Sequence, residues 1–201
     1  MDFGLYTALN GFTARHDWAE DPLRFFAVQG QVFFVLLLAG LFLLRGKWRT
    51  VAGRHGVIAA GFSAALALGI AQIIIRLWER PRPYLAHPHT AHLFIPAAHD
   101  PSFPSDHATA AFAIAVALLL RHRRAGILAL AMAAVLSVAR VAVGTHYPGD
   151  VLGGAALGAT AALLLWHPAV RRPLHALADW SGRLYETVTD RLLHRPRASP
   201  A

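Results

Sequence analysis

Cysteine is absent from this 201-residue chain, and charged side chains are scarce. Without cysteine, neither a disulfide nor a thiolate metal site can form. Only 15% of the residues are charged and 56% are hydrophobic, whereas soluble domains average about 25% charged and about 45–50% apolar residues. This imbalance indicates an integral membrane protein. Acidic residues are fewer than basic ones, 11 against 19; in a membrane protein this excess reports orientation, and we expect no nucleic-acid partner.

Five apolar segments approach the length of about 20 residues that a helix needs to cross a bilayer core. They cover residues 25–44, 56–77, 108–120, 125–143 and 151–166. The third and fifth are short, and we expect them to extend at their outer ends if the bundle buries a polar pocket there. The sequence therefore predicts an all-α, polytopic membrane helical bundle with about five transmembrane helices.

The segments that flank the predicted transmembrane core, residues 25–166, are expected at the membrane surface. Residues 1–24 predict an amphipathic, interfacial N-terminal helix, because apolar residues recur there at helical spacing. These residues are Phe3, Leu5, Tyr6, Leu9 and Phe12. Residues 167–201 form a basic tail, and Leu174, Leu177, Trp180 and Leu184 suggest a second interfacial helix in it.

Basic residues concentrate on one side of the predicted bundle. The connection 45–55 holds four, the connection 121–124 holds three, and the tail holds six. Cytoplasmic loops carry an excess of lysine and arginine, so this side is expected in the cytoplasm. The N-terminus, residues 78–107 and the turn 144–150 then face outward.

The outward side collects an unusual set of polar residues. They are Arg80, Arg82, Ser105, Asp106, His107, Arg140, His146 and Asp150. An arginine near a bilayer is costly and is therefore a functional candidate. Arginines, a serine hydroxyl and the amides of a helix N-terminus together suit a tetrahedral oxyanion.

Two histidines in this set could act on such an anion from opposite sides. His146 and Asp150 are four residues apart and share a face if the turn is helical. An aspartate that accepts from one imidazole nitrogen frees the other as a nucleophile, although the same spacing also occurs in ordinary helix-capping pairs. His107 begins a different helix, and in-line displacement at phosphorus requires attack on one side and protonation on the other.

The same residues form a three-part pattern that resembles the type 2 phosphatidic acid phosphatase superfamily. The family pattern is Lys-x6-Arg-Pro, then Pro-Ser-Gly-His, then Ser-Arg-x5-His-x3-Asp. The parts read here Arg82-Pro83, Pro104-Ser105-Asp106-His107 and Arg140-x5-His146-x3-Asp150. The resemblance covers about residues 56–166.

Three positions depart from the pattern. Ile75 stands at the lysine position with Arg76 beside it, Asp106 replaces the glycine, and Ala139 replaces the serine. The aspartate variant is most similar to the undecaprenyl-diphosphate phosphatase branch, which recycles a bacterial lipid carrier. That branch implies a multi-pass protein of the bacterial inner membrane whose active site faces the extracytoplasmic side.

The resemblance implies a role for each position. His146 attacks phosphorus and forms a phosphohistidine, Asp150 orients it, and His107 protonates the leaving lipid phosphate. The remaining residues are expected to bind the substrate phosphate: Arg82, Ser105, Arg140, Asp106, Arg76 and Arg80. The family implies no metal and no cofactor, and its partners are lipid phosphates or diphosphates and membrane lipids.

Several alternatives stay open at this stage. The substrate could be phosphatidic acid or phosphatidylglycerol phosphate instead of undecaprenyl diphosphate, and a non-catalytic lipid or anion transporter is a remote alternative. Arg80 could contact phosphate or lie on the surface. Four histidines crowd one loop, where they could bind a metal or a headgroup or form plain loop surface. They are His87, His89, His92 and His99.

Overall fold

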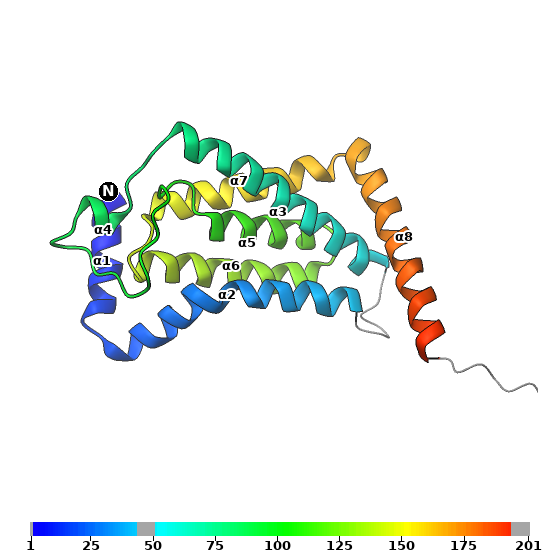
Figure 1. Cartoon of the computed structure of the whole chain (residues 1–201), viewed down its shortest axis with the longest axis horizontal. Helices are drawn as coiled ribbons and strands as arrows, with labels where there is room; N and C mark the ends of the chain where they lie inside the picture. The colour runs from blue at the N-terminus through cyan, green and yellow to red at the C-terminus, as the bar shows by residue number, and fades with distance from the viewer. Residues whose placement is uncertain (1, 44–50, 194–201) are drawn as a thin grey trace, which may run out of the picture.

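The computed structural model describes residues 2–43 and 51–193 (Figure 1). Within these ranges the chain is helical and contains no strand, which confirms the all-α prediction. The remaining residues lie outside the description. They include Leu44 of the first predicted span and part of the predicted basic segments. Those basic residues are Arg45, Lys47, Arg49, Arg195 and Arg197.

Eight helices succeed one another in the described residues. They are α1 (Asp2–Ala14), α2 (Asp17–Leu43), α3 (Val51–Leu77), α4 (Pro83–Ala86), α5 (Asp106–Leu119), α6 (Arg123–Ala142), α7 (Pro148–Trp166) and α8 (Pro168–Leu193). Helices α2, α3, α5, α6 and α7 run side by side as a bundle, and α8 crosses one end of it (Figure 1). The α1 and α4 segments lie at the other end.

Four bundle helices are long and apolar enough to cross a membrane: α2, most of α3, α6 and α7. The fifth, α5, has 14 residues and is about 21 Å long at 1.5 Å per residue. It packs against α3, α6 and α7 in the middle of the bundle. Because protein surrounds it, a short helix leaves no backbone exposed to lipid, and polar residues at its ends are tolerated.

Glycines on α7 allow a close approach to α5. A Cβ on Gly154 would lie 2.6 Å from the Ser105 carbonyl oxygen, and one on Gly158 would collide with the Thr109 carbonyl oxygen. Small residues are the usual means by which membrane helices approach one another. The contact brings the first turn of α7 against the first turn of α5, where the Ser105 N–H donates to the Asp150 carbonyl oxygen at 3.1 Å.

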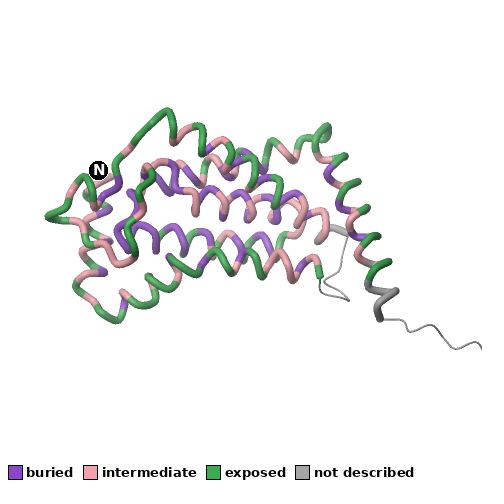
Figure 2. The backbone as a smooth tube through the Cα atoms, viewed as in Figure 1, coloured by how far each residue is buried: buried purple, intermediate pink, exposed green. Residues whose placement is uncertain are grey.

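The outer faces of the bundle are apolar. Figure 2 shows buried residues on the facing sides of the helices and exposed ones along the outer sides of α2 and α3. Val35 and Leu36 on α2 and Ile73 on α3 are among the exposed large hydrophobic residues. A continuous apolar exterior of this size is typical of a surface that contacts lipid, so the chain is a multi-pass membrane protein.

The N-terminal region differs from the expectation. One helix ends at Ala14 and the next begins at Asp17, so α2 starts well before residue 25, where the first span was predicted. The face that α1 buries is also different, because Leu5 and Phe12 are exposed, whereas Tyr6 and Asn10 are buried. The Asn10 amide donates to the carbonyl oxygens of His92 and Ala142 at 2.8 and 2.9 Å. Polar contacts therefore help to fix α1 on the bundle.

The helix of the basic tail packs against the bundle at its start. Leu174 and Ala178 are buried, whereas Leu177, Trp180 and Leu184 are exposed. Of the four apolar residues that suggested this helix, only Leu174 contributes to the core. The exposed three leave an apolar stripe at the end of the bundle opposite α1 (Figure 1), and an interfacial position for α8 remains a prediction.

Candidate active site

His146 lies in the turn between α6 and α7 and is 1% exposed. Gly144 shapes this turn with a φ of +90°, a conformation that favours glycine. The Nδ1 atom of His146 lies 2.9 Å from the Ser102 carbonyl oxygen. A carbonyl oxygen only accepts, so Nδ1 carries the proton and Nε2 keeps a free lone pair. The turn thus holds the imidazole in the tautomer that a nucleophile requires.

Asp150 sits in the first turn of α7 and is completely buried. One carboxylate oxygen, Oδ2, accepts from the Tyr147 N–H at 2.8 Å and from the Ser102 hydroxyl at 2.5 Å. The same oxygen is 3.7 Å from His146 Nδ1, an ion-pair distance rather than a hydrogen bond. We expected Asp150 itself to orient the imidazole, but the Ser102 carbonyl is the direct acceptor. Asp150 therefore acts on the ring by its charge and through Ser102.

Two arginines converge on the free nitrogen of His146. Arg82 Nη1 lies 3.3 Å and Arg140 Nη2 lies 3.5 Å from Nε2. Arg82 is held in place by the carbonyl and the carboxylate of Asp100, both at 2.9 Å. Arg140 donates to the Ala27 carbonyl oxygen of α2 at 3.3 Å. Two buried cations that face one neutral nitrogen create a position that favours a phosphoryl group.

The first turn of α5 forms the other side of the site. Among the described residues, Ser105 Oγ and Asp106 Oδ1 are buried atoms without a hydrogen-bond partner. The second oxygen of Asp106 accepts from Gln72 of α3 at 3.2 Å. His107 lies close enough to Arg140 and His146 for their charges to act on its ring. The helix begins here with amide groups that lack intrahelical partners, which adds donors for an anion.

The structure does not place every predicted phosphate ligand at this site. The guanidinium of Arg80 is occupied by the carboxylates of Asp150 and Asp2, at 2.6 Å each, instead of facing the anion position. Arg76 is exposed in the last turn of α3. Gln72, one turn earlier, reaches Asp106 from α3 in its place. Two acids thus already neutralise Arg80, and phosphate binding by this residue stays an untested prediction.

The crowded histidine loop packs against α1. The ring of His87 stacks on Phe3 at a centroid distance of 3.8 Å, and the His92 N–H donates to Asn10 at 2.9 Å. His89 and His99 are exposed. In the described part of the chain, His, Asp and Glu side chains form no group that could hold a metal ion. The loop therefore connects the N-terminal helix to the site.

Burial sets the protonation state of His146. Burial lowers the pKa of its imidazole most, contact with Asp150 raises it, and the charges of Arg140 and Arg82 lower it further, to about 4. The ring is therefore neutral near pH 7, and its lone pair is available for attack.

The sequence interpretation assigned no role to four residues that contact the site: Ser102, Asp100, Gln72 and Asp2. Ser102 and Asp100 lie two and four residues before the second motif, in a stretch that resembles the undecaprenyl-diphosphate phosphatase branch, but the sequence assigned them no role. Asp2 and Gln72 reach the site only through contacts between distant segments.

The helical membrane bundle and the anion site around a neutral histidine define a membrane-embedded phosphatase. Residues 56–173 match the PAP2 superfamily, and the chain belongs to that family. It is 30% identical to "Undecaprenyl-diphosphatase BcrC" of Bacillus subtilis over 98% of this chain and 97% of that protein. It is 29% identical to "Putative undecaprenyl-diphosphatase YbjG" of Escherichia coli, with 90% of each chain covered.

Solved structures have the same fold. LpxE of Aquifex aeolicus superposes with a TM-score of 0.60 and 26% identity, over 81% of this chain and 93% of that one. A PAP2-type phosphatidylglycerolphosphate phosphatase from Bacillus subtilis gives a TM-score of 0.56 over 81% and 83% of the two chains. The family model and the Bacillus subtilis relative confirm the family suggested by the three motifs.

Proposed function

We propose that the protein hydrolyses undecaprenyl diphosphate to undecaprenyl phosphate and phosphate through a phosphohistidine on His146. The observation that carries the proposal is the geometry at Nε2, where a neutral imidazole nitrogen faces Arg82 and Arg140. The relatives named undecaprenyl-diphosphatases support the choice of substrate, since they match nearly the whole chain.

In the first step, His146 Nε2 forms a bond to the terminal phosphorus. The bond from phosphorus to the bridging oxygen breaks, and His107 delivers a proton to the lipid phosphate that leaves. The negative charge of the bound diphosphate favours the protonated form of His107 that this step requires. The Nδ1–H of His146 stays on the Ser102 carbonyl, and the charge of Asp150 stabilises the cationic ring. Arg82, Arg140 and the Ser105 hydroxyl balance the charge on the phosphoryl oxygens.

In the second step, neutral His107 takes a proton from water, and the resulting hydroxide attacks phosphorus. The bond between Nε2 and phosphorus breaks, and phosphate is released. His107 is protonated again and Nε2 regains its lone pair, so one water molecule is consumed for each diphosphate.

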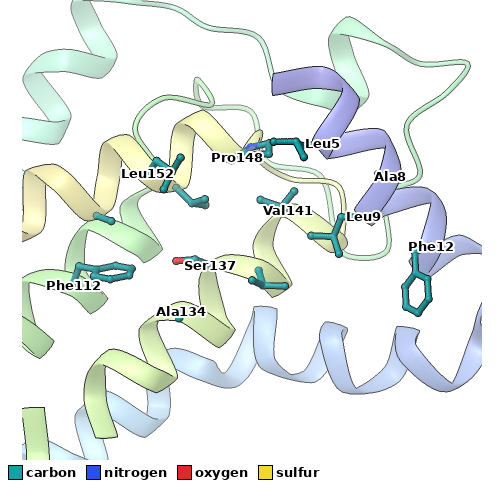
Figure 3. Close-up of a pocket in the computed structure, with 13 residues that line it drawn as sticks. Leu5, Ala8, Leu9, Phe12, Phe112, Ala134, Ser137, Val141, Pro148 and Leu152 are labelled. Atoms are coloured by element: carbon teal, nitrogen blue, oxygen red, sulfur yellow. The ribbon is translucent and has the colours of Figure 1, made fainter. Parts of the chain in front are cut away.

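An apolar groove next to His107 supports a lipid leaving group. It lies between α2 and α5, has a volume of about 180 Å³, and is lined by His107 with Phe34, Leu38 and Ile114 among others. A larger apolar groove of about 650 Å³ lies beside α1, between α6 and α7 (Figure 3), and none of the predicted catalytic residues lines it. Since His107 protonates the leaving group, the smaller groove is where the prenyl chain begins.

The distribution of charge supports an extracytoplasmic site in the bacterial inner membrane. Arg121 precedes α6, Arg123 and Arg124 begin α6, and the basic helix α8 crosses the same end of the bundle, opposite the turn that carries His146 (Figure 1). By the positive-inside rule that end is cytoplasmic. The site then meets lipid diphosphate in the outer leaflet.

The test is phosphate release by the purified protein from undecaprenyl diphosphate, phosphatidate and phosphatidylglycerol phosphate, compared by kcat/KM. We expect the highest value for undecaprenyl diphosphate and an acid-labile phosphoenzyme that is absent in His146→Ala. His89→Ala, in the exposed part of the outer loop, is the matched control. A highest value for a glycerolipid would assign the alternative substrate, phosphate binding without release would indicate a transporter, and turnover by His146→Ala would exclude the phosphohistidine.

A further inference from the structure

Arg80 connects the catalytic carboxylate to the N-terminal helix. Its Nη1 donates to Asp150 Oδ1 and its Nη2 to Asp2 Oδ2, both at 2.6 Å. The guanidinium carbon lies 4.1 Å from the centroid of the Tyr147 ring, which covers one face of the cation. Arg80 is therefore fixed by a carboxylate on either side and by an aromatic ring.

Asp2 also holds the helix turn that carries Asp150. Its second carboxylate oxygen, Oδ1, accepts from the Gly149 N–H at 2.8 Å. That amide belongs to the first turn of α7, where negative charge is favourable. Asp2, Arg80, Asp150 and Gly149 thus form a closed ring that joins α1, the segment after α3, and α7.

Polar and apolar contacts together place α1, and with it Asp2. Asn10 is fully buried and holds the outer loop and the end of α6, and Tyr6 is buried in an apolar cluster with Val141 and Tyr147. The apolar side of α1 leaves the 650 Å³ groove open toward α6 and α7 (Figure 3). Because the groove leaves part of α1 without apolar partners, the contacts of Asp2 add a polar constraint on how α1 meets the active site.

The charges in the ring explain why a second acid is useful. The Arg80 cation is shared between Asp2 and Asp150, so Asp150 is not fully neutralised by it. Without Asp2, the full charge of Arg80 would fall on Asp150. The negative field of Asp150 at the His146 ring, 3.7 Å away, would then be weaker.

We propose that Asp2 is a positioning residue of the phosphatase: it holds Arg80 and the first turn of α7 so that Asp150 keeps its place and its charge beside His146. The role rests on the proposed function of His146 and deepens it, because it couples the seating of α1 to the nucleophile. Asp2 touches no substrate atom in this role. Its effect belongs in the chemical step rather than in substrate binding.

The test is a double-mutant cycle on the full chain with Asp2→Ala, Arg80→Gln and the combined variant, assayed by phosphate release. We expect Asp2→Ala to lower kcat about 10-fold and to change KM less than about twofold, because the charge-assisted contacts with Arg80 and the Gly149 N–H behind the nucleophile are lost. In the Arg80→Gln background, Asp2→Ala should cause little further loss, since both act through the same carboxylate. Asp17→Ala, an exposed acid at the start of α2, is the matched control.

Asp2→Asn protects the test against a folding defect, because it keeps an oxygen for the Gly149 N–H and changes only the charge. Wild-type turnover by Asp2→Asn, losses that multiply across the cycle, or a change in KM alone would each overturn the positioning role. The wild-type protein is the reference in every assay. Its own failure to release phosphate would overturn the proposed function, whereas the outcomes above concern the positioning role alone.

Discussion

At the α8 end of the bundle, His55 Nε2 lies 2.9 Å from Asp179 Oδ1, closer than the 3.7 Å between His146 and Asp150 at the other end. The surroundings of the two pairs differ. Asp179 has a side chain that is 44% exposed, whereas Asp150 is completely buried. The ring of His55 stacks on His175 at 3.9 Å, whereas the free nitrogen of His146 faces two arginines.

Arginines at the two ends are also held in different ways. Arg121 and Arg171 lie over the ring of Trp166, at 4.7 and 4.5 Å from its centroid. Arg82 and Arg140 are instead oriented by carbonyl oxygens and a carboxylate toward one point. A short distance between histidine and aspartate is therefore a poor sign of a catalytic site. Burial of the carboxylate and the direction of neighbouring cations distinguish the proposed nucleophile, His146, from His55.

Among the variants that test this difference between the two groups of arginines, Arg82→Lys is expected to lower phosphate release the most. A lysine cannot reproduce the fork that contacts Asp100, Thr145 and His146 at once, and losing one donor to a developing oxyanion costs about 10²–10³-fold in kcat. We expect a fall of that size in phosphate release. Arg171→Lys at the α8 end is the control and should keep wild-type activity. Equal activity of the two variants would contradict the distinction between the arginine groups.

Ser102→Ala tests whether the hydrogen bond to the buried carboxylate of Asp150 matters for catalysis. The variant removes the hydroxyl that donates to Asp150 at 2.5 Å but keeps the carbonyl that holds His146 Nδ1. Loss of a buried hydrogen bond to a charged group should lower kcat about 10-fold. Ser181→Ala is the matched control, because that hydroxyl donates only within α8, to the Ala178 carbonyl at 3.0 Å. Wild-type kcat in Ser102→Ala would remove Ser102 from the chain of contacts.

The acid limb of the pH profile reports the charge around His146. A protonated imidazole is no nucleophile, so this residue's contribution to kcat/KM should be lost as the pH falls through about 4. Asp150→Asn removes the anion that raises this pKa and should shift the limb to lower pH. Arg82→Gln removes a cation that lowers it and should shift the limb to higher pH, each by about one pH unit.

Shifts are read against the wild-type protein on the same substrate, because ionisation of the substrate then cancels. If both variants moved the limb in the same direction, the charges of Asp150 and Arg82 would not control the nucleophile.

The two ends also show what could be predicted from the sequence. His107, Arg140, His146 and Asp150 stand in short motifs with fixed spacing, and the helices of a membrane bundle bring such motifs to one end. Hydropathy located the transmembrane helices, because the thickness of the bilayer imposes a minimum length on each apolar helix. It missed the first turns of α2, because Asp17, Glu20 and Asp21 lower the local hydropathy while the backbone continues as a helix.

Contacts between distant segments could not be predicted. Asp2 is 147 residues from Gly149, and no local pattern marks an acid that will pair with Arg80. The contacts of Arg80 with two acids could not be predicted for the same reason, because its environment depends on where α1 docks. The contact of Gln72 with Asp106 could not be predicted either, because nothing near Gln72 in the sequence indicates which residue its amide will bind.

The smallest expected effect is that of Asp179→Asn at the α8 end. We expect phosphate release within about twofold of wild type, because the carboxylate of this pair is 44% exposed and lies at the end of the bundle opposite His146. The hydrogen bond with His55 lowers the pKa of Asp179 below its usual 3.8. The stabilisation is therefore present above pH 3.8 and is lost as the pH falls through the lower, folded-state value.

Thermal unfolding of the wild type and of Asp179→Asn tests the direction of this pH dependence. Wild type should unfold at a slightly higher temperature than Asp179→Asn at pH 6, and the difference should shrink as the pH is lowered below 3.8. A difference that grew on acidification would reverse the assigned linkage. A loss of phosphate release as large as that of Ser102→Ala would show that the second histidine–aspartate pair also serves the reaction, and the contrast between the two ends would then no longer hold.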